Sequence, residues 1–478
     1  MTTAARTVTV ALATLGFAVS AHAATYVVTA KSATSFDSQL ARKIEAAGGR
    51  ISARLPQIGV AIVESDDPGF ATRAARLQGV HAVTPDLVLQ FEIPPHGDSI
   101  DDSYANPPNS GDNDPRFDLQ WGHAAVDAAG AWNRGYRGAG AKVAVLDSGI
   151  ACQHPDLAPN LLMADSASFI AGEGVCLARV NAFNHGSHVA GTIAAADNGV
   201  GVIGVAPEAK IVAVKVLSEN TGSGSFAGII QGIVHAADRG ADVINMSLGV
   251  RGGLPVNGPG ANQVRELVNA TARATRYASS RNALVIASAG NDGRDLDKDS
   301  RTVLCDSDGA NCFNANLRAF PAELPGVLTI AATAPIGWAK APTSTFLDNL
   351  ASYSNYGQSA IDFAAPGGDA VYPGNENCTM AGLTRPCWVF DLVLSVGGYS
   401  QPVPGGPVLG SYSWAAGTSM AAPHVSGVAA LVIGKHGGEL APSEVERILR
   451  AAADDLGKPG NDSLYGAGRI NAARAVQF

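Results

Sequence analysis

Short apolar runs alternate with amphipathic stretches over most of the chain. The runs are apolar on both faces and cover residues 143–146, 211–217, 243–246, 284–287, 327–330 and 361–363. Between several of them, apolar residues recur at helical spacing, as at Phe226, Ile229, Ile230 and Ile233. Strands that are apolar on both faces need cover on both sides. The pattern therefore predicts an α/β fold with a doubly wound, mostly parallel sheet and helices on both faces.

The amino-terminal part of the chain follows a different pattern. Strand-like and helical segments alternate at residues 26–29, 36–47, 60–63, 69–77 and 81–91. They predict a small α+β unit over residues 24–92. Residues 93–111 are rich in Pro, Asp, Asn, Ser and Gly, which is typical of an exposed, cleavable linker. The doubly wound domain then occupies residues 112–478.

The first 23 residues have the pattern of a secretory signal peptide. Arg6 precedes an apolar run over residues 8–19, and Ala21-His22-Ala23 resembles a cleavage site. The alternative is an uncleaved membrane anchor, for which the apolar run is short. No later run is long enough to span a membrane. We therefore expect a secreted protein, either extracellular or periplasmic in transit, without a membrane partner.

Export changes how the six cysteines are interpreted. An even number in an oxidising compartment predicts disulfides, and six cysteines allow 15 pairings. They fall into three local couples, which we favour as the disulfides: Cys152 with Cys176, Cys305 with Cys312, and Cys378 with Cys387. A zinc site is the alternative, but it lacks a C-x-x-C pattern.

Charge excludes nucleic acid as an expected partner. The formal net charge is -9, from 33 Lys and Arg against 42 Asp and Glu. The chain has no cluster of basic residues that would bind a phosphate backbone.

Three segments carry side chains suited to acyl transfer. Asp147 ends an apolar run, His185 and His188 open a stretch of small residues, and Ser419 lies between a glycine-bearing turn and an apolar helix. Taken alone, each has a simpler interpretation as a turn residue, a structural histidine or a helix cap. Together they supply an alcohol, an imidazole base and a carboxylate that orients the imidazole. Spacing alone leaves both histidines open as the base.

These segments resemble the signature motifs of the subtilisin-like serine peptidases, and the resemblance covers about residues 112–475. The matching motifs are Asp147-Ser-Gly, His185-Gly-Ser-His-Val-Ala-Gly-Thr and Gly417-Thr-Ser-Met-Ala-Ala-Pro-His, with Ser187 where Thr is commoner. The chain order Asp, His, Ser is also that of subtilisin. The resemblance implies that Ser419 is the nucleophile, that His185 rather than His188 is the base, and that Asp147 orients it. Asn291 matches the family's oxyanion-hole asparagine.

The same resemblance implies where a polypeptide substrate binds. The family lays an extended peptide between two backbone edges, which correspond to Gly222-Ser223-Gly224 and Ser247-Leu248-Gly249. A side-chain pocket next to the scissile bond is implied between the second edge and Ser288-Ala289-Gly290, with Ala319 at its base. Because Ala319 is neither acidic nor basic, we expect a roomy apolar pocket and broad specificity.

Further expectations rest on the resemblance alone. A structural calcium ion is implied, with Asp114, Asp156 and Asn198 as ligands and carbonyl groups of residues 196–202 adding oxygens. Residues 24–92 resemble the inhibitor-type propeptides of the family, which assist folding, block the cleft and are removed by self-cleavage. The alternative for this unit is an independent accessory domain. Nothing in the sequence requires more than a monomer.

Two rival functions remain open at this point. One is a catalytically inactive binding scaffold with the same fold, although all the expected catalytic groups are present. The other is an esterase or lipase, but Ser419 lies in Gly-Thr-Ser-Met rather than G-x-S-x-G, and the order of the three residues differs from that of α/β-hydrolases.

Overall fold

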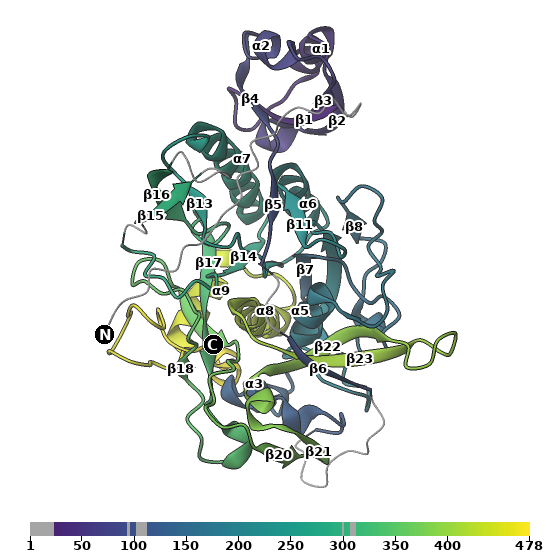
Figure 1. The fold of residues 1–478 in the computed structure, drawn as a ribbon, viewed down its shortest axis with the longest axis vertical. Helices are drawn as coiled ribbons and strands as arrows, with labels where there is room; N and C mark the ends of the chain where they lie inside the picture. The colour runs from purple at the N-terminus through teal and green to yellow at the C-terminus, as the bar shows by residue number, and fades with distance from the viewer. Residues whose placement is uncertain (1–22, 93–95, 102–111, 299–300, 306–311) are drawn as a thin grey trace.

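The computed structural model describes residues 23–92, 96–101, 112–298, 301–305 and 312–478 (Figure 1). Almost all of the expected signal peptide, the larger part of the expected linker and the Cys305 side chain lie outside the described residues.

The main sheet is built from the six apolar runs found in the sequence. Among the described residues its strand order is β18-β17-β14-β12-β7-β10-β8, with β19 beside β17. All pairings are parallel except that of β17 with the short β18. The strands are β7 (Lys142–Asp147), β8 (Ala167–Ser168), β10 (Lys210–Lys215), β12 (Val243–Met246), β14 (Leu284–Ser288), β17 (Val327–Ala334), β18 (Asn349–Leu350) and β19 (Phe363–Pro366).

Helices cover both faces of this sheet, as expected. The main ones are α5 (His185–Ala194), α6 (Phe226–Asp238), α7 (Ala261–Ser280), α8 (Thr418–Lys435) and α9 (Pro442–Ala452). Strand β7 shows the division: Val143 and Val145 pack into the core with α5, α8 and α9, whereas Ala144 and Leu146 pack into the core with α6 and α7. Burial on both faces explains why the strands are apolar throughout. The predicted fold class is confirmed.

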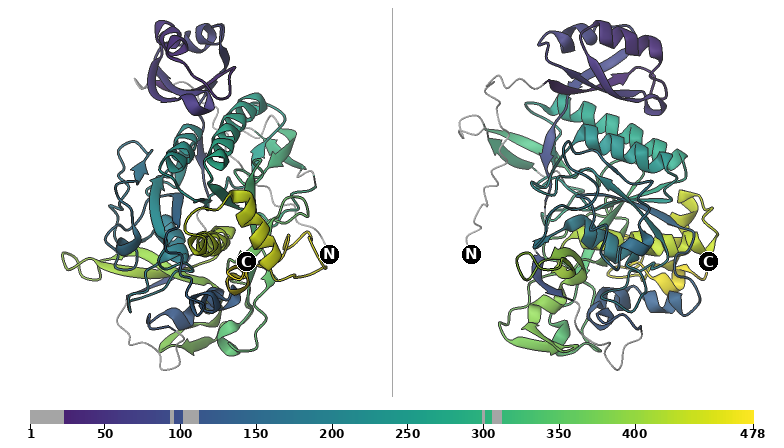
Figure 2. Two further views of the ribbon diagram at one scale, coloured as in Figure 1. Left: turned by 180° about the vertical axis from the view of Figure 1, so that it is seen from behind. Right: turned by 90° about the vertical axis from the view of Figure 1, so that its right-hand side faces the viewer.

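Residues 24–85 form a unit with its own antiparallel sheet, whose strand order is β2-β3-β1-β4. Its elements are β1 (Ala24–Ala30), α1 (Ser38–Ala46), β2 (Arg50–Leu55), β3 (Val60–Ser65), α2 (Phe70–Ala74) and β4 (Val80–Pro85), and β5 (Val88–Gln90) follows outside this sheet. Strand β2 was not expected from the sequence, because its residues alternate between exposed and half-buried positions. One face of the sheet carries α1 and α2, while Val27, Ile58 and Ile62 pack with α6 and α7 (Figure 2).

The expected linker contains a strand. β6 (His96–Asp101) pairs antiparallel with β23 (Leu409–Ala415) at the edge of a second sheet, whose strand order is β6-β23-β22-β9. The neighbouring strands are β22 (Val393–Ser400) and β9 (Ala182–Phe183). Ile100 is buried in the main core, so this part of the segment is not exposed as its composition suggested.

Two of the three expected disulfides are confirmed, Cys152–Cys176 and Cys378–Cys387. The backbones of Cys305 and Cys312 lie opposite each other where β15 (Arg301–Cys305) pairs with β16 (Cys312–Arg318).

Within the residues that the structure describes, no helix combines the length and apolar character needed to cross a membrane.

The helix layer allows a test of the packing. Ile230 of α6 is fully buried in the core, whereas the neighbouring Gln231 is half-buried and its amide donates only to Ala227 of its own helix. We expect Ile230→Ala to lower the free energy of unfolding by about 2–5 kcal/mol, because the lost side chain leaves a cavity. Chemical denaturation of the full-length chain measures this. Gln231→Ala is the control, and equal losses in both variants would contradict this packing.

Candidate active site

Asp147 and His185 are in direct contact. Asp147 is the last residue of β7, and His185 is the first residue of α5. Both side chains are buried, and His185 Nδ1 lies 2.8 Å from Asp147 Oδ2 and 2.9 Å from Oδ1. The carboxylate therefore holds the proton on Nδ1 and leaves Nε2 as the nitrogen that can accept a proton. His185 Nε2 is buried and has no hydrogen-bond partner among the described residues.

The local sequence explains why α5 begins beside Asp147. Asn184 is the N-cap, and its side chain accepts hydrogen bonds from the backbone and hydroxyl of Ser187 at 2.7 and 2.6 Å. Gly186 permits the close approach, because a Cβ there would lie 2.2 Å from the carbonyl oxygen of Gly149. The small residues of the motif thus bring the helix start against the end of β7.

The second histidine of the motif does not contact Asp147. His188 is fully buried, with Nε2 lying 3.1 Å from the carbonyl oxygen of Val393 and 3.0 Å from that of Ser413. Burial, with the nearby His185 adding to it, lowers the pKa of His188 to about 3. In this environment a neutral imidazole donates to the two carbonyl oxygens.

Ser419 lies in the first turn of α8, whose N-cap is Gly417. Helix α8 packs against α5, so the two helix starts that carry Ser419 and His185 belong to neighbouring elements. The Ser419 hydroxyl donates to the carbonyl oxygen of Ser247 at 3.3 Å. The hydroxyl of Ser419 is therefore directed at the residue that follows β12 (Val243–Met246).

Asn291 lies beside the start of α8. It follows β14, and its Oδ1 accepts hydrogen bonds from the Thr418 backbone at 2.9 Å and the Thr418 hydroxyl at 2.8 Å. These bonds fix the orientation of the amide, so that Nδ2 points away from Thr418. Nδ2 donates to the carboxylate of Glu92 at 3.2 Å. The amide expected to stabilise an oxyanion thus already donates to a carboxyl oxygen of the chain itself.

A segment of the chain itself occupies the expected substrate edges. Strand β5 pairs antiparallel with β11 (Ser223–Ser225), with Leu89 opposite Gly224. Next to it, Phe91 N donates to the carbonyl oxygen of Gly222 at 3.3 Å, and Glu92 N donates to that of Gly249 at 3.2 Å. Residues 88–92 therefore lie as an extended strand between the two edges that the sequence assigned to substrate.

The remaining expected pocket residues lie beside these edges. Ser288 ends β14, and its hydroxyl donates to the carbonyl oxygen of Leu248 at 3.4 Å. Gly290 N donates to Thr418 Oγ1 at 3.1 Å, and Ala289 is fully buried. Gly290 has φ +97° and an added Cβ would lie 2.6 Å from Asn355, so only glycine fits this turn.

Glu92 was not expected at this site. Its carboxylate is half-buried, and burial raises its pKa, with the nearby Asp292 adding to the increase. A cavity of about 40 Å³ beside it is lined by residues that include Phe91, His185 and Glu219. The composition of residues 93–111 indicated a boundary here, but no sequence pattern indicated that the preceding carboxylate reaches Asn291.

The three expected calcium ligands also come together. Asn198 N donates to Asp114 Oδ1 at 3.4 Å, and Asn198 Nδ2 lies 3.4 Å from Asp156 Oδ1. Asp114 is fully buried, and its Oδ2 has no hydrogen-bond partner among the described residues. Burial and the neighbouring Asp112 raise the pKa of Asp114 to about 8. A buried carboxylate oxygen without a partner fits a cation that binds oxygen ligands.

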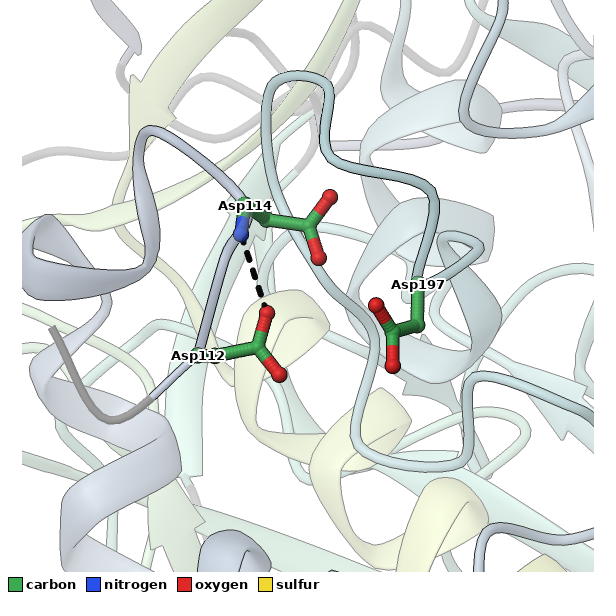
Figure 3. A group of neighbouring side chains, drawn as sticks. All are labelled: Asp112, Asp114 and Asp197. Carbon is green, nitrogen blue, oxygen red and sulfur yellow. Dashed lines mark hydrogen bonds between the residues drawn. The ribbon is translucent and has the colours of Figure 1, made fainter. Parts of the chain in front are cut away.

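Two further carboxylates lie beside Asp114. Figure 3 shows Asp112, Asp114 and Asp197 directed at a common space, with Asp114 N donating to Asp112 Oδ1 at 3.0 Å. Asp197 also forms an ion pair with Arg137, which lies 4.0 Å from Asp112. Asp112 and Asp197 were not expected as ligands, although each lies within two residues of an expected ligand.

Most of this chain is similar to known proteins. The model of the subtilase family matches residues 138–468. A thermostable alkaline protease from Halalkalibacterium halodurans is 36% identical over 361 residues, which cover 75% of this chain and 74% of that protein. Subtilisin Savinase from Lederbergia lenta is 34% identical over 365 residues, which cover 75% of this chain and 99% of that protein.

A structural likeness extends over the amino-terminal unit as well. The epidermin leader peptide processing serine protease from Staphylococcus aureus superimposes with a TM-score of 0.69, covering 95% of this chain and 98% of that chain. At 22% identity, this likeness shows the fold alone. Because the family model matches more than half of the chain and the relatives exceed 30% identity, the chain belongs to the subtilase family and is a serine endopeptidase.

Proposed function

We propose that this chain is the precursor of a secreted endopeptidase that cleaves extended polypeptides with broad specificity, using Ser419, His185 and Asp147. The observation that carries the proposal is the extended segment 88–92, which lies between the two backbone edges and ends at Asn291. A cleft that binds the chain's own backbone in this way can bind another polypeptide with little regard to side chains.

The proposed reaction uses groups already positioned around the cleft. His185 Nε2 takes the proton of Ser419 as its oxygen attacks the scissile carbonyl, while Asp147 stabilises the imidazolium. Asn291 Nδ2 and the Ser419 N–H stabilise the oxyanion. His185 then protonates the leaving amine, and water repeats the sequence on the acyl-enzyme.

Residues 24–92 are proposed to be a propeptide that inhibits the enzyme until self-cleavage removes it. Contacts on two sides support this role. Strand β5 occupies the cleft edge, and Arg273 of α7 donates to the carbonyl oxygens of Ala30 at 3.1 Å and of Ile58 and Gly59 at 3.4 Å. The body of the unit is therefore held on α7 while its end blocks the cleft.

A structural calcium ion is proposed at Asp114, Asp156 and Asn198. The orphaned Asp114 Oδ2 supports it, and Asp112 adds a nearby carboxylate. When bound, calcium would neutralise these groups and tie residues 196–202 to the segment that begins at residue 112. It takes no part in the chemistry.

The amino-terminal pattern supports secretion, and we propose that the enzyme acts as a monomer.

Substitution of Ser419 tests the proposed nucleophile. We expect Ser419→Ala to accumulate as uncut precursor and to leave casein intact, because the nucleophile is lost. Casein digestion by the wild-type chain, with and without a serine-directed phosphonate, measures the same function chemically. Ser280→Ala, at the exposed end of α7, is the control. Normal maturation of Ser419→Ala in a host without other proteases would end the self-processing proposal.

Substitution of Glu92 tests whether its contact with Asn291 blocks the cleft. Its carboxylate must leave Asn291 before a peptide carbonyl can take that place, so we expect Glu92→Ala to self-cleave roughly tenfold faster, as loss of one charge-assisted hydrogen bond allows. The conversion of precursor is followed over time on gels. Glu45→Ala, exposed on α1, is the control and should leave the rate unchanged. An unchanged or slower rate in Glu92→Ala would contradict the blocking role of this contact.

Thermal stability with and without calcium tests the proposed ion site. Added to the uncut Ser419→Ala chain at about a hundredfold above its Kd, calcium should stabilise the fold by about 2.7 kcal/mol relative to EDTA. Thermal unfolding measures this stabilisation. Asp114→Asn should remove the effect, and Asp66→Asn, exposed in the amino-terminal unit, should retain it. An equal effect in both variants would place the calcium elsewhere.

A further inference from the structure

A buried ion cluster lies beneath the end of β7. Lys215, the last residue of β10, is opposite Asp147 in the sheet and is fully buried. Its Nζ donates to the carbonyl oxygen of Ser148 at 2.7 Å and lies 3.0 Å from Glu173 Oε2 and 3.6 Å from Glu219 Oε1. A buried ammonium needs such partners, because its charge is otherwise costly to remove from water.

Glu173 also holds the turn that leads into the cleft edge. Its carboxylate accepts hydrogen bonds from the Ser218 hydroxyl, from Glu219 N at 2.9 Å and from Asn220 Nδ2 at 3.2 Å. The Ser218 oxygen in turn accepts from the backbone of Asn220 at 3.1 Å and of Thr221 at 3.2 Å. This one carboxylate therefore organises the turn at residues 218–222, which precedes β11.

The other end of the cluster reaches the start of α5. Ser148 Oγ accepts from Gly186 N at 3.1 Å and from Asn184 Nδ2 at 3.2 Å, on either side of His185. Direct contacts thus connect the helix start, Ser148, Lys215, Glu173 and the cleft edge. They join the strand that carries Asp147 to the edge that holds the extended segment.

Glu173 is itself fixed from its own side. It lies on the loop closed by the Cys152–Cys176 disulfide, and Ile150 N donates to the carbonyl oxygen of Val175 at 3.0 Å. Burial opposes ionisation of Glu173, but hydrogen bonds from Ser218, Glu219 N and Lys215 outweigh it and hold its pKa at about 2. Because the pKa is depressed, the stabilisation that the Glu173 carboxylate provides is fully present at pH values above the ordinary pKa of a glutamate. It is lost only as the pH falls toward 2.

We propose that Glu173 is a positioning residue for substrate binding. It holds residues 218–222 so that Gly222 and Gly224 present their backbone groups to substrate residues on the amino-terminal side of the scissile bond. Lys215 keeps this edge in a fixed place relative to Asp147 and His185. The inference rests on the proposed function of the cleft, and it adds a residue that touches neither the substrate nor the reacting atoms.

Steady-state kinetics of the processed enzyme test the proposal. Glu173→Gln should raise KM about tenfold for a peptide with four residues before the scissile bond. For a short substrate with one blocked residue there, KM should stay within about twofold, and kcat should change little on either substrate. Glu439→Gln, exposed between α8 and α9, is the control. Equal losses on both substrates, or no loss on the longer one, would overturn the proposal.

Amide hydrogen exchange provides a measurement that needs no peptidase activity. In the full-length Ser419→Ala chain, Glu173→Gln should speed exchange about tenfold at Ser218 and Gly222, whose N–H groups bond to Ser223 and Ser218, with no change in β12. If Glu173→Gln does not fold, Glu173→Asp should show a smaller increase at the same amides. Unchanged exchange would overturn the positioning role, whereas failure of the wild-type chain to digest casein would overturn the proposed function alone.

Discussion

The parallel pairing of β7, β12 and β14 is the constraint on which the site depends. Because adjacent parallel strands end at one edge of a sheet, the residues that follow them share that edge. Asp147, Ser247 and Asn291 are brought together in this way, and α5 and α8 begin at the same edge with His185 and Ser419. A close backbone approach at Gly186 and a positive φ at Gly290 accompany this arrangement.

The cleft edges bind through backbone groups, and that property serves two proposed purposes. The groups that would bind a substrate strand also bind β5 of the same chain, because hydrogen bonds between backbones do not distinguish one extended segment from another. The packing of the amino-terminal unit on α6 and α7 raises the effective concentration of this segment at the cleft. Glu92 adds a specific contact by placing a carboxylate on Asn291.

Three buried titratable groups differ in the partners that surround them. Burial lowers the pKa of His188 and keeps it neutral, although the two carbonyl oxygens that accept its N–H hydrogen bond act in the opposite direction. Lys215 lies beside the carboxylates of Glu173 and Glu219. This cluster connects the end of β7 to the turn before β11 by direct contacts. Asp114 Oδ2 has no hydrogen-bond partner among the described residues, and this supports the proposed cation.

The sequence by itself determined the sheet, its helices and the residue types of the site, because apolar periodicity and motif spacing are local properties. It did not reveal β2, because the residues of β2 alternate between exposed and half-buried positions and form no apolar run. It also did not reveal the strand at residues 96–101, because its pairing partner lies more than 300 residues away. Tertiary structure alone decided that Ser419 bonds to Ser247, that Glu92 meets Asn291 and that Glu173 reaches Lys215. Each of these contacts joins segments that are distant along the chain, and their relative placement follows from packing that no local pattern encodes.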